Sequence, residues 1–434
     1  MRELVRITML VVIFCVASAG WLFLGGVMMA RSDSQERALH GAVADLWGQP
    51  LSQSAPTAQY SWIEHYDRFE SARDAKGNLV YENGKPVQIA IPDTRPASRD
   101  LALAATDVDV TLTLDQRRKG LMWFPLYDVG FAGRYRIEVD GDEPNGTLWL
   151  TFQFPFADGV YDDFQFTVDG VEMADLHPPV NGQVQVPVPT SPGDTVEFTV
   201  AYRSRGMTEW SYRPSTGVAQ LRDFDLHMST DFADIDFPGF TLSPSSKSRT
   251  DAGWTLDWTF SRLVTGHGMG MVMPEPVQPG PLAASMSFSA PISLGLFMLW
   301  IYVLGLLRNI DIHPVNHLFL AATFFSFHLL FGYTTDHIPV EWAFALSSVV
   351  SLFLTISYLR LVAGPRFATF EAGGAQLLYL VGFSLAHFWD GFTGLTVTVL
   401  GILTLFALGQ LTGRIRWSDV FRGPVRTPTV TAAG

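Results

Sequence analysis

The side chains best able to do chemistry lie in the last third of the chain, within and beside apolar segments. His313 and His317 are four residues apart, so a helix would place both imidazoles on one face, where they could share a metal ion. Pro314 suits the first turn of a helix, which favours a capping role for His313. His328 lies in the middle of an apolar segment, where an ionisable group is costly and suggests a function.

Further ionisable residues lie in the short loops between the apolar segments. One loop contains Asp336, His337 and Glu341, and the other contains Asp390. A proton or ion pathway normally needs acidic groups at mid-depth in the membrane, and only His328 is central. The candidate functional polar residues of the predicted bundle are His313, His317, His328, Asp336, His337 and Glu341. We assign no catalytic residue, no cofactor and no metal.

The polar middle of the chain offers weaker candidates. Two acidic clusters could bind calcium, but neither has the spacing of a known calcium loop, which favours solvated turns: Asp158, Asp162 and Asp163, and Asp231, Asp234 and Asp236. His65 lies beside Glu64 and Asp67 and could form an acid–base pair, although a surface histidine is the simpler interpretation. The methionines of residues 265–273 could bind copper(I), but an apolar segment that leads the chain back to the bilayer is our interpretation.

Long uncharged segments dominate the two ends of the chain. The first is Ile7–Ala30, and the later ones are Ala290–Leu307, Val315–Tyr333, Trp342–Leu359, Leu377–Phe388 with its upstream turns, and Thr393–Leu411. About 20 apolar residues in a helix span the hydrocarbon core, so the sequence predicts six transmembrane helices. The first could be a cleaved signal peptide, but its apolar run continues beyond Ala19, which favours an anchor. Cys15 lies in this helix, and we expect a buried, inert thiol.

Positive charges near the ends of these segments predict the orientation. They lie before the first segment, after the second, between the fourth and fifth, and after the sixth: Arg2, Arg6, Arg308, Arg360, Arg366, Arg414, Arg416, Arg422 and Arg426. The loops Thr334–Glu341 and Trp389–Phe392 contain no Lys or Arg. The pattern places both termini in the cytoplasm and the large polar region outside.

The polar region has the alternating pattern of half-buried strands. Apolar residues alternate with polar ones at Val108, Val110, Leu112 and Leu114, at Val184, Val186 and Val188, at Val196, Phe198 and Val200, and at Trp254, Leu256, Trp258 and Phe260. Turn pairs that favour hairpins are Lys76-Gly77, Asn83-Gly84, Asp140-Gly141, Asn145-Gly146, Asp169-Gly170 and Asn181-Gly182. The region therefore predicts an antiparallel β-sandwich-like domain without disulfides.

The predicted fold class is an α+β membrane protein. Residues 1–30 form an N-terminal transmembrane anchor, 31–285 a large periplasmic β-rich domain, 286–413 a C-terminal bundle of five transmembrane helices, and 414–434 a cytoplasmic tail. Its first partner is the lipid bilayer. The net charge of −13 argues against binding to nucleic acid and to anionic lipid surfaces.

Several motifs spread over the chain carry a family resemblance. They are Arg117-Arg118-Lys119-Gly120-Leu121, then Phe124-Pro125-Leu126-Tyr127-Asp128, Gly133-Arg134-Tyr135, Gly253-Trp254 with Trp258 and Phe260, His313-Pro314, and Asp336-His337. In these motifs and in layout, the chain resembles the CreD family of bacterial inner-membrane proteins, described as cell envelope integrity proteins. It departs from the family pattern at Ser243–Ser246 and at Gly266–Met273. The resemblance implies a link to envelope stress and two-component regulation, and it implies no catalytic residues.

Three functions remain open. The first is a non-enzymatic inner-membrane protein of the CreD type, whose β-domain contacts a periplasmic or membrane partner. The second is a transporter or channel that uses the helical bundle. The third is a periplasmic glycan-binding or glycan-processing protein, suggested by Trp62 and Trp123 near carboxylates.

Overall fold

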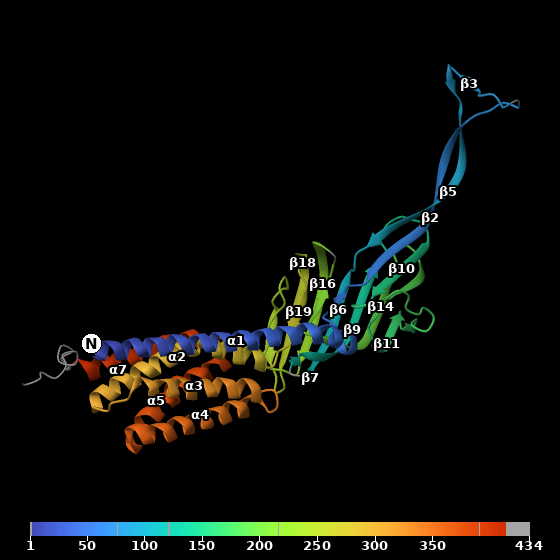
Figure 1. The fold of residues 1–434 in the computed structure, drawn as a ribbon. Coiled ribbons are helices and arrows are strands. Elements are labelled where there is room, and N and C mark those ends of the chain that lie inside the picture. The colour runs from blue at the N-terminus through green and yellow to red at the C-terminus, as the bar shows by residue number, and fades with distance from the viewer. Residues whose placement is uncertain (1, 76, 120–121, 216, 390, 414–434) are drawn as a thin grey trace, which may run out of the picture. The chain divides into compact units, whose positions relative to one another are not determined.

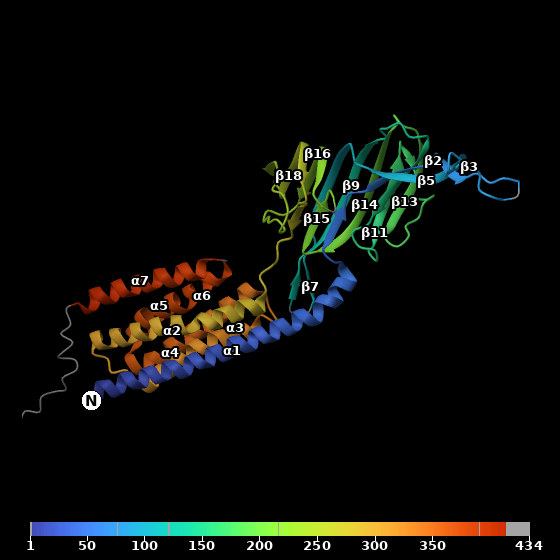
Figure 2. The same cartoon turned by 90° about the horizontal axis from the view of Figure 1, so that it is seen from above.

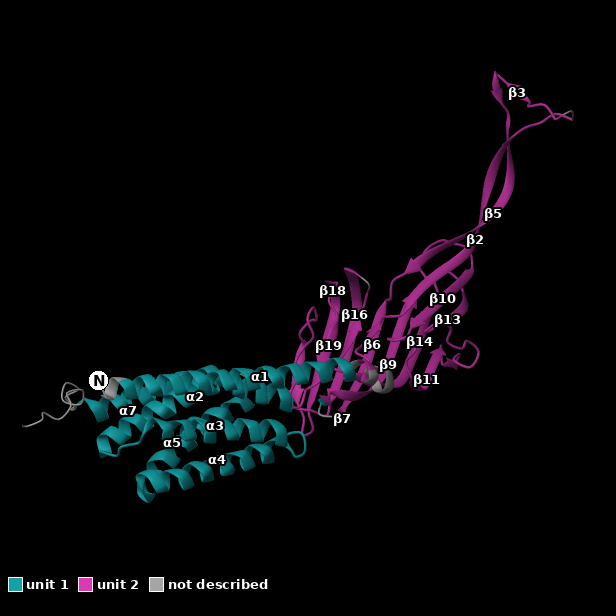
Figure 3. Ribbon diagram, in the orientation of Figure 1, with its two compact units in different colours: residues 1–39, 120–122, 277–434 teal, residues 40–119, 123–276 magenta. Residues whose placement is uncertain are grey.

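A computed structural model describes residues 2–75, 77–119, 122–215, 217–389 and 391–413. The chain is a mixed α and β protein that forms two compact units (Figure 3). The helical unit comprises Met1–Leu39, Gly120–Met122 and Val277–Gly434, and the β unit comprises His40–Lys119 and Trp123–Pro276. Lys76, Asp390 and the arginines from Arg414 onwards lie outside the described residues, as does the predicted tail 414–434.

The first helix is longer than the predicted anchor. The helix α1 (Arg2–Trp47) joins Ile7–Ala30 and the following polar residues without a break. It ends before Gly48, whose φ of 121° is a conformation that suits glycine. The Cys15 side chain is exposed, so the chain itself does not bury this thiol as predicted.

Four long helices follow in the last third of the chain. They are α2 (Pro279–Arg308), α3 (Pro314–Thr334), α4 (Val340–Ala363) and α7 (Phe392–Thr412) (Figures 1 and 2). Within the helical unit, α1 packs on α3, where the ring centroids of Trp21 and Phe325 are 5.3 Å apart. The cluster of buried side chains is largely aromatic and aliphatic, as Phe297 and Phe324 illustrate with ring centroids 4.6 Å apart.

The segment between α4 and α7 is helical but irregular. It consists of η1 (Phe367–Ala372), α5 (Gly373–Gln376), η2 (Leu377–Gly382), α6 (Phe383–Leu385) and η3 (Ala386–Phe388), of which η1 and η2 are π-helical. Five helices of the described chain are long and apolar enough to cross a membrane, and this segment is not among them. The helix predicted around Leu377–Phe388 is present, as a continuous helical run over residues 365–388 in which the π-helical turns η1 and η2 interrupt the α-helical pattern. The glycines Gly373 and Gly374 help explain this, since glycine weakens a regular helix.

The β unit contains nineteen strands among the described residues. They are β1 (Leu51–Ser54), β2 (Thr57–Ser71), β3 (Tyr81–Glu82), β4 (Lys85–Pro86), β5 (Gln88–Leu101), β6 (Ala105–Leu114), β7 (Arg117–Lys119), β8 (Met122–Phe124), β9 (Leu126–Glu138), β10 (Gly146–Gln153), β11 (Tyr161–Val168), β12 (Val171–Glu172), β13 (Gln183–Thr190), β14 (Thr195–Met207), β15 (Glu209–Arg213), β16 (Ala219–Thr230), β17 (Ser246–Arg249), β18 (Trp254–Thr265) and β19 (Met269–Val272). All four predicted strands are confirmed, as β6, β13, β14 and β18.

The strands form two large sheets and three small ones. The eight-stranded sheet has the order β12-β11-β14-β9-β6-β16-β18-β17, and the four-stranded sheet has the order β13-β10-β2-β5. The small sheets are β1-β15-β19, β3-β4 and β7-β8. The two large sheets share one core, in which Phe131 of β9 and Phe152 of β10 have ring centroids 6.3 Å apart. The predicted sandwich-like packing is thus confirmed.

The prediction of a purely antiparallel domain is wrong at two pairings. Strand β16 runs parallel to β6, and β1 runs parallel to β15. A parallel pair needs a long connection, and in both cases several other strands intervene in the chain. Alternation and turn residues report on neighbouring strands, so they could not reveal these pairings.

The predicted turn pairs are confirmed where both residues adopt positive φ. This holds for Asn83-Gly84, Asp169-Gly170 and Asn181-Gly182, with φ between 48° and 79°. It does not hold for Asn145-Gly146, because Gly146 is the first residue of β10. A Cβ atom at Gly146 would lie 2.2 Å from the Ser61 carbonyl oxygen, so the glycine permits a close backbone approach.

Two buried tyrosines in the core of the β unit have hydrogen-bond partners. The Tyr202 hydroxyl donates to Gln53 Oε1 at 2.8 Å, and the Tyr127 hydroxyl donates to the Glu209 carbonyl oxygen at 2.6 Å. Burial raises the pKa of both tyrosines well above the usual value. Since the domain has no cysteine, this packed aromatic core must stabilise it without disulfides.

Candidate functional site

The candidate polar residues of the helical unit do not form one site. Two lie at the first turn of α3, one lies in its middle, and three lie between its end and the start of α4: His313 and His317, His328, and Asp336, His337 and Glu341. No group of three His, Cys, Asp or Glu side chains that could hold a metal occurs among the described residues. The structure therefore distributes these residues over the length of α3.

His313 is the N-cap of α3, as predicted. Its Nδ1 accepts a hydrogen bond from the backbone N–H of Val315 at 3.3 Å. The side chain of His317 is 1% exposed, and its Nδ1 lies 3.4 Å from the His313 carbonyl oxygen. The His313 imidazole thus satisfies one of the free backbone N–H groups at the beginning of α3, whereas His317 contacts a carbonyl oxygen one turn earlier.

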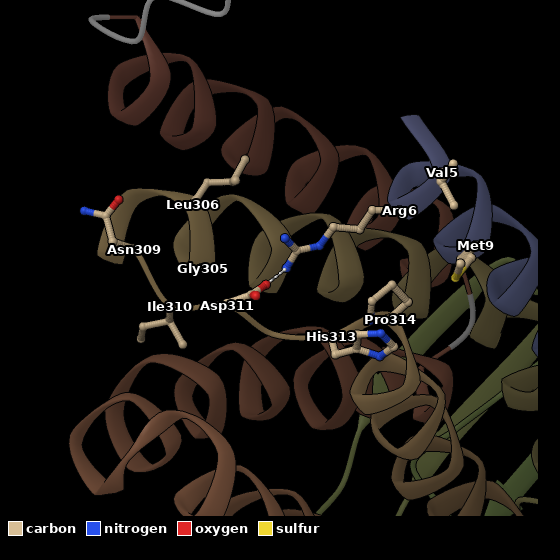
Figure 4. Close-up of a pocket in the computed structure, with 10 residues that line it drawn as sticks. All are labelled: Val5, Arg6, Met9, Gly305, Leu306, Asn309, Ile310, Asp311, His313 and Pro314. Atoms are coloured by element: carbon tan, nitrogen blue, oxygen red, sulfur yellow. Dashed lines mark ion pairs between the residues drawn. The ribbon is translucent and has the colours of Figure 1, made fainter. Parts of the chain in front are cut away.

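A pocket of about 780 Å³ opens beside His313 (Figure 4). It is lined by Val5, Arg6, Met9, Gly305, Leu306, Asn309, Ile310, Asp311, His313 and Pro314. The Arg6 guanidinium forms an ion pair with Asp311 at 3.0 Å and donates to the Ile312 carbonyl oxygen at 2.7 Å. The cation of this pocket is therefore already neutralised, and its contacts join the start of α1 to the α2–α3 turn.

A second ion pair lies at the other end of α3. Arg31 of α1 pairs with Asp336, and its guanidinium carbon lies 6.0 Å from the centroid of the Tyr333 ring. The Asp336 side chain is only 17% exposed, so this pair is shielded from solvent better than that of Arg6. His337 and Glu341 are exposed beside it. The predicted acidic loop therefore serves to fasten α1 to α3.

His328 is buried among aromatic rings. Its ring centroid lies 5.8 Å from that of Trp21 and 4.9 Å from that of Phe327, both in edge-on geometry. Its Nδ1 lies 3.2 Å from the Phe324 carbonyl oxygen one turn earlier. The local contacts of this residue are those of a packed and hydrogen-bonded core side chain.

The structure brings together a polar network that the sequence interpretation missed. Ser347, Ser351 and Thr355 are spaced four residues apart, so they lie along one face of α4. Thr355 Oγ1 lies 2.7 Å from Thr323 Oγ1, and Ser351 donates to the Thr323 carbonyl oxygen at 2.7 Å. Gln376 Nε2 donates to Ser351 Oγ at 2.7 Å. The four-residue spacing of hydroxyls and the one amide in an apolar segment were the signals available.

Gln376 is placed by the irregular segment. It is the last residue of α5, between the two π-helical turns η1 and η2. Its Oε1 and the Oγ of Ser347 are buried without a hydrogen-bond partner among the described residues. These groups can exchange hydrogen bonds with a water molecule, but hydroxyls and an amide supply neither a base nor a strong metal ligand.

A second pocket, of about 530 Å³, contains a Ser–His pair. It is lined by Ser285, Phe288, Ser289, His387, Trp389, Gly391 and Thr393. Ser289 Oγ lies 2.8 Å from His387 Nε2 and also 3.0 Å from the Met286 carbonyl oxygen. Nucleophilic catalysis needs a third group that orients the base, and His387 Nδ1 has no partner among the described residues. We therefore assign no catalytic role to this pair.

The acidic clusters of the β unit have structural partners. Asp163 forms an ion pair with Arg203, and Asp231 Oδ1 accepts a hydrogen bond from the Leu114 backbone N–H at 2.9 Å. Asp236 Oδ1 accepts from the Phe237 backbone N–H at 2.8 Å. These contacts are typical of turns and strand ends.

The Gly/Met segment is part of the β core. Residues 269–272 form β19, which pairs with β15, and Met269, Met271 and Met273 are at most 1% exposed. The segment is thus structural, as interpreted, but it is a strand of the β unit. Packed thioethers of this kind fill space in the core.

The β unit also contains a hydrogen-bonded chain on its eight-stranded sheet. Asp257 of β18 lies between His227 of β16 and Ser246 of β17, at 2.6 Å from His227 Nδ1 and 2.7 Å from Ser246 Oγ. Hydrogen bonds from Ser246 and His227 lower the pKa of Asp257 below its usual value. The aspartate occupies the central position, so the histidine lies at the end of the chain and has no serine to activate.

Comparisons with known proteins leave the family open. No family model matches the chain, and no curated protein matches it. Among solved structures, it is similar to a proposed nutrient-binding protein from Legionella pneumophila subsp. pneumophila str. Philadelphia 1. The TM-score is 0.26 and the identity 11%, over 56% of this chain and 86% of the other. A similarity this weak carries no argument about the function of this chain.

Proposed function

We propose that this chain is a multi-pass protein of the bacterial inner membrane that carries its β unit in the periplasm and has no enzymatic activity of its own. The observation that carries the proposal is the apolar outer surface of the helices. On α7 this surface includes Leu395, Val399, Ile402, Leu403, Leu405 and Phe406, each at least 44% exposed. An apolar surface of this extent is unfavourable in water and is what a helix needs to lie in lipid.

The same feature recurs on the first helix. In the most apolar windows of Val5–Leu39 and Phe392–Thr412, only 11% of the residues are buried within the chain. The basic residues Arg6, Arg308 and Arg360 lie at helix ends that the orientation rule assigns to the cytoplasm. The β unit is then on the opposite side of the membrane from the termini.

The proposed role is that of a CreD-type protein that contributes to envelope integrity through its β unit. The motif resemblance supports it, and so do the structural roles of the ionisable residues described above. Asp336 and His328 pack or pair within the helical unit, and the Ser289–His387 pair has no orienting acid among the described residues. The β unit is left as the part that would contact a periplasmic or membrane partner.

The two alternatives have less support. A transporter would use polar groups at mid-depth, and the buried hydroxyl–amide network around Gln376 has no ionisable member. A glycan site would bring Trp62 and Trp123 together, but these lie on β2 and β8, which belong to different sheets. Trp62 instead stacks on Tyr60, with ring centroids 5.7 Å apart.

A complementation experiment tests the proposed role. Deletion of the gene should increase the sensitivity of the cells to detergent and cell-wall antibiotics, and the full chain should restore resistance. Ser289→Ala and His328→Phe should restore it equally well, because each keeps the local packing while removing the candidate chemistry. The proposal fails if deletion leaves sensitivity unchanged, or if either variant is present at normal levels and does not complement.

A further inference from the structure

The strands β2 and β5 extend beyond their sheet as a two-stranded ribbon (Figure 1). Strand β10 pairs with β2 only over Thr57–Ser61, whereas β2 and β5 continue to pair from Trp62↔Ala97 to Ser71↔Gln88. An isolated two-stranded ribbon is marginally stable in water. Side-chain contacts on its two faces must therefore add to the stability that the backbone pairing gives.

One face of the ribbon is held by its own charges. Arg95 Nε lies 2.7 Å from Glu64 Oε2, and the Arg95 guanidinium lies 5.2 Å from the Tyr66 ring centroid. The Tyr66 hydroxyl donates to Asp93 at 3.3 Å, and Arg68 pairs with Glu70 at 2.7 Å. The charged groups of this face are paired within the chain, although Ile89 and Ile91 on the same face are 50% and 37% exposed.

The opposite face is uncovered. This open face consists of Ile63, His65, Asp67 and Phe69 of β2 and of Ala90, Pro92, Thr94 and Pro96 of β5, which are cross-strand partners of one another. All eight are exposed, with Ile63 at 52% and Phe69 at 66%. Within the described chain, the side chains of His65 and Asp67 form no hydrogen bond or ion pair. The open face thus combines exposed apolar groups with an imidazole and a carboxylate that have no partner within the described chain.

The ribbon has two edges, and one of them, along β2 beyond Ser61, has no partner strand within the described chain. The other edge is hindered for strand pairing. Proline has no N–H, so Pro92 and Pro96 interrupt the row of donors along the edge strand β5. Strand addition at this edge is therefore disfavoured.

The open face is self-complementary. Consider two ribbons stacked face to face and related by a two-fold axis that passes the Tyr66↔Asp93 pair. The axis lies in the plane between the ribbons and runs perpendicular to their strands. It places β2 antiparallel over β2 of the second copy. Ile63 then faces Phe69, and His65 faces Asp67. The same axis places Ala90 against Pro96 and Pro92 against Thr94 on β5. Apolar groups meet at both ends, and an imidazole meets a carboxylate on each side of the centre.

We propose that the open face binds the open face of a second copy of this chain, as an isologous two-fold contact. Face-to-face sheets lie about 10 Å apart, a distance that an imidazole and a carboxylate can bridge. A patch of eight residues per partner is smaller than most stable interfaces, so the dimer is reversible and depends on its centre. The inference does not rest on the envelope role proposed above, since it needs only that two copies meet.

Cross-linking in native membranes tests the arrangement. Two copies of the Cys15→Ser chain are co-expressed, one with Ile63→Cys and one with Phe69→Cys, and treated with a short bismaleimide, because the facing backbones are too far apart for a disulfide. The matched control pairs Glu64→Cys with Arg68→Cys, which have the same centre but lie on the charged face. We expect at least tenfold more cross-linked dimer from the first pair. Equal or lower yield from the first pair overturns the proposal.

A charge exchange tests the same contact in the purified full-length protein. Asp67→Lys and His65→Asp should each raise the dimer dissociation constant at least tenfold, because the first removes the carboxylate that faces the imidazole and the second places two carboxylates opposite one another. The double variant His65→Asp/Asp67→Lys restores opposite charges and should return the constant to within about threefold. Asp158→Lys, an exposed charge reversal elsewhere on the β unit, should have no effect. The proposal is contradicted if the single variants leave the dimer dissociation constant unchanged, or if the double variant dimerises as weakly as the single variants. A partner of another kind on this face would also give that result.

Discussion

Asp257 illustrates how single charged residues act in this chain. It joins three strands, because it accepts hydrogen bonds from Ser246 on β17 and from His227 on β16. Both partners favour the ionised carboxylate, which lowers the pKa of Asp257 below its ordinary value of 3.8.

The lowered pKa of Asp257 predicts a pH dependence of stability. A carboxylate with a lower pKa in the folded state stabilises the fold above its unfolded pKa, and this contribution is lost as the pH falls through the folded pKa. We expect Asp257→Asn to lower the free energy of unfolding at pH 7 by about 1 kcal/mol or less, since the site is partly exposed. Below about pH 4 the difference from wild type should shrink. Denaturant unfolding at pH 7 and pH 3 checks this, and a difference that is the same at both pH values would contradict it.

The sequence was informative about residues with local roles and silent about those with distant partners. The capping role of His313 followed from the adjacent Pro314, and the structure confirms it. The partner of Asp336 is Arg31, which lies 305 residues earlier in the chain, and no local pattern joins them. Gln376 carries no charge, so it did not stand out until its bond to Ser351 was visible.

At the scale of elements, period-two patterns located strands reliably because alternate residues are buried on one side. Val108, Val110 and Leu112 are at most 1% exposed in β6, as the pattern predicts. The pattern contains no information about which distant strand lies alongside, so the parallel pairing of β6 with β16 was missed. The π-helical turns around Gln376 were missed for a similar reason, since apolar composition does not distinguish π from α turns.

The strand β9 offers a matched test of its packing. A Cβ atom at Gly133 would lie 2.5 Å from the hydroxyl of Tyr135, which is buried and stacks on Phe198. A Cβ at Gly130 would find its nearest neighbour, Thr111 Cβ, at 3.9 Å. We expect Gly133→Ala to lower the free energy of unfolding by about 1–3 kcal/mol, and Gly130→Ala to change it by less than about 0.5 kcal/mol. Thermal unfolding of the two variants tests this expectation. Equal stabilities would contradict the claim that close packing on Tyr135 requires a glycine at position 133.

At the scale of the whole molecule, the chain combines a helical unit with an apolar surface and a β unit with a closed aromatic core. The division was predictable, because the uncharged segments and the alternating segments do not overlap in the sequence. The number of crossings was harder to predict: five regular helices meet the requirements for a span, and a sixth crossing needs the continuous helical run over residues 365–388, which contains π-helical turns. The proposed function belongs to this scale, because it assigns lipid contact to the helical unit and partner contact to the β unit.

The central claim is that the apolar helices cross a bilayer and hold the β unit on the side away from the termini. Reporter fusions in living cells test it most directly, with a reporter that is active only outside the cytoplasm placed at Asp142 of the β unit and at the C-terminal Gly434. We predict activity at Asp142 and none at Gly434, and the reverse for a reporter that is active only in the cytoplasm. Activity of one reporter at both positions would contradict the claim.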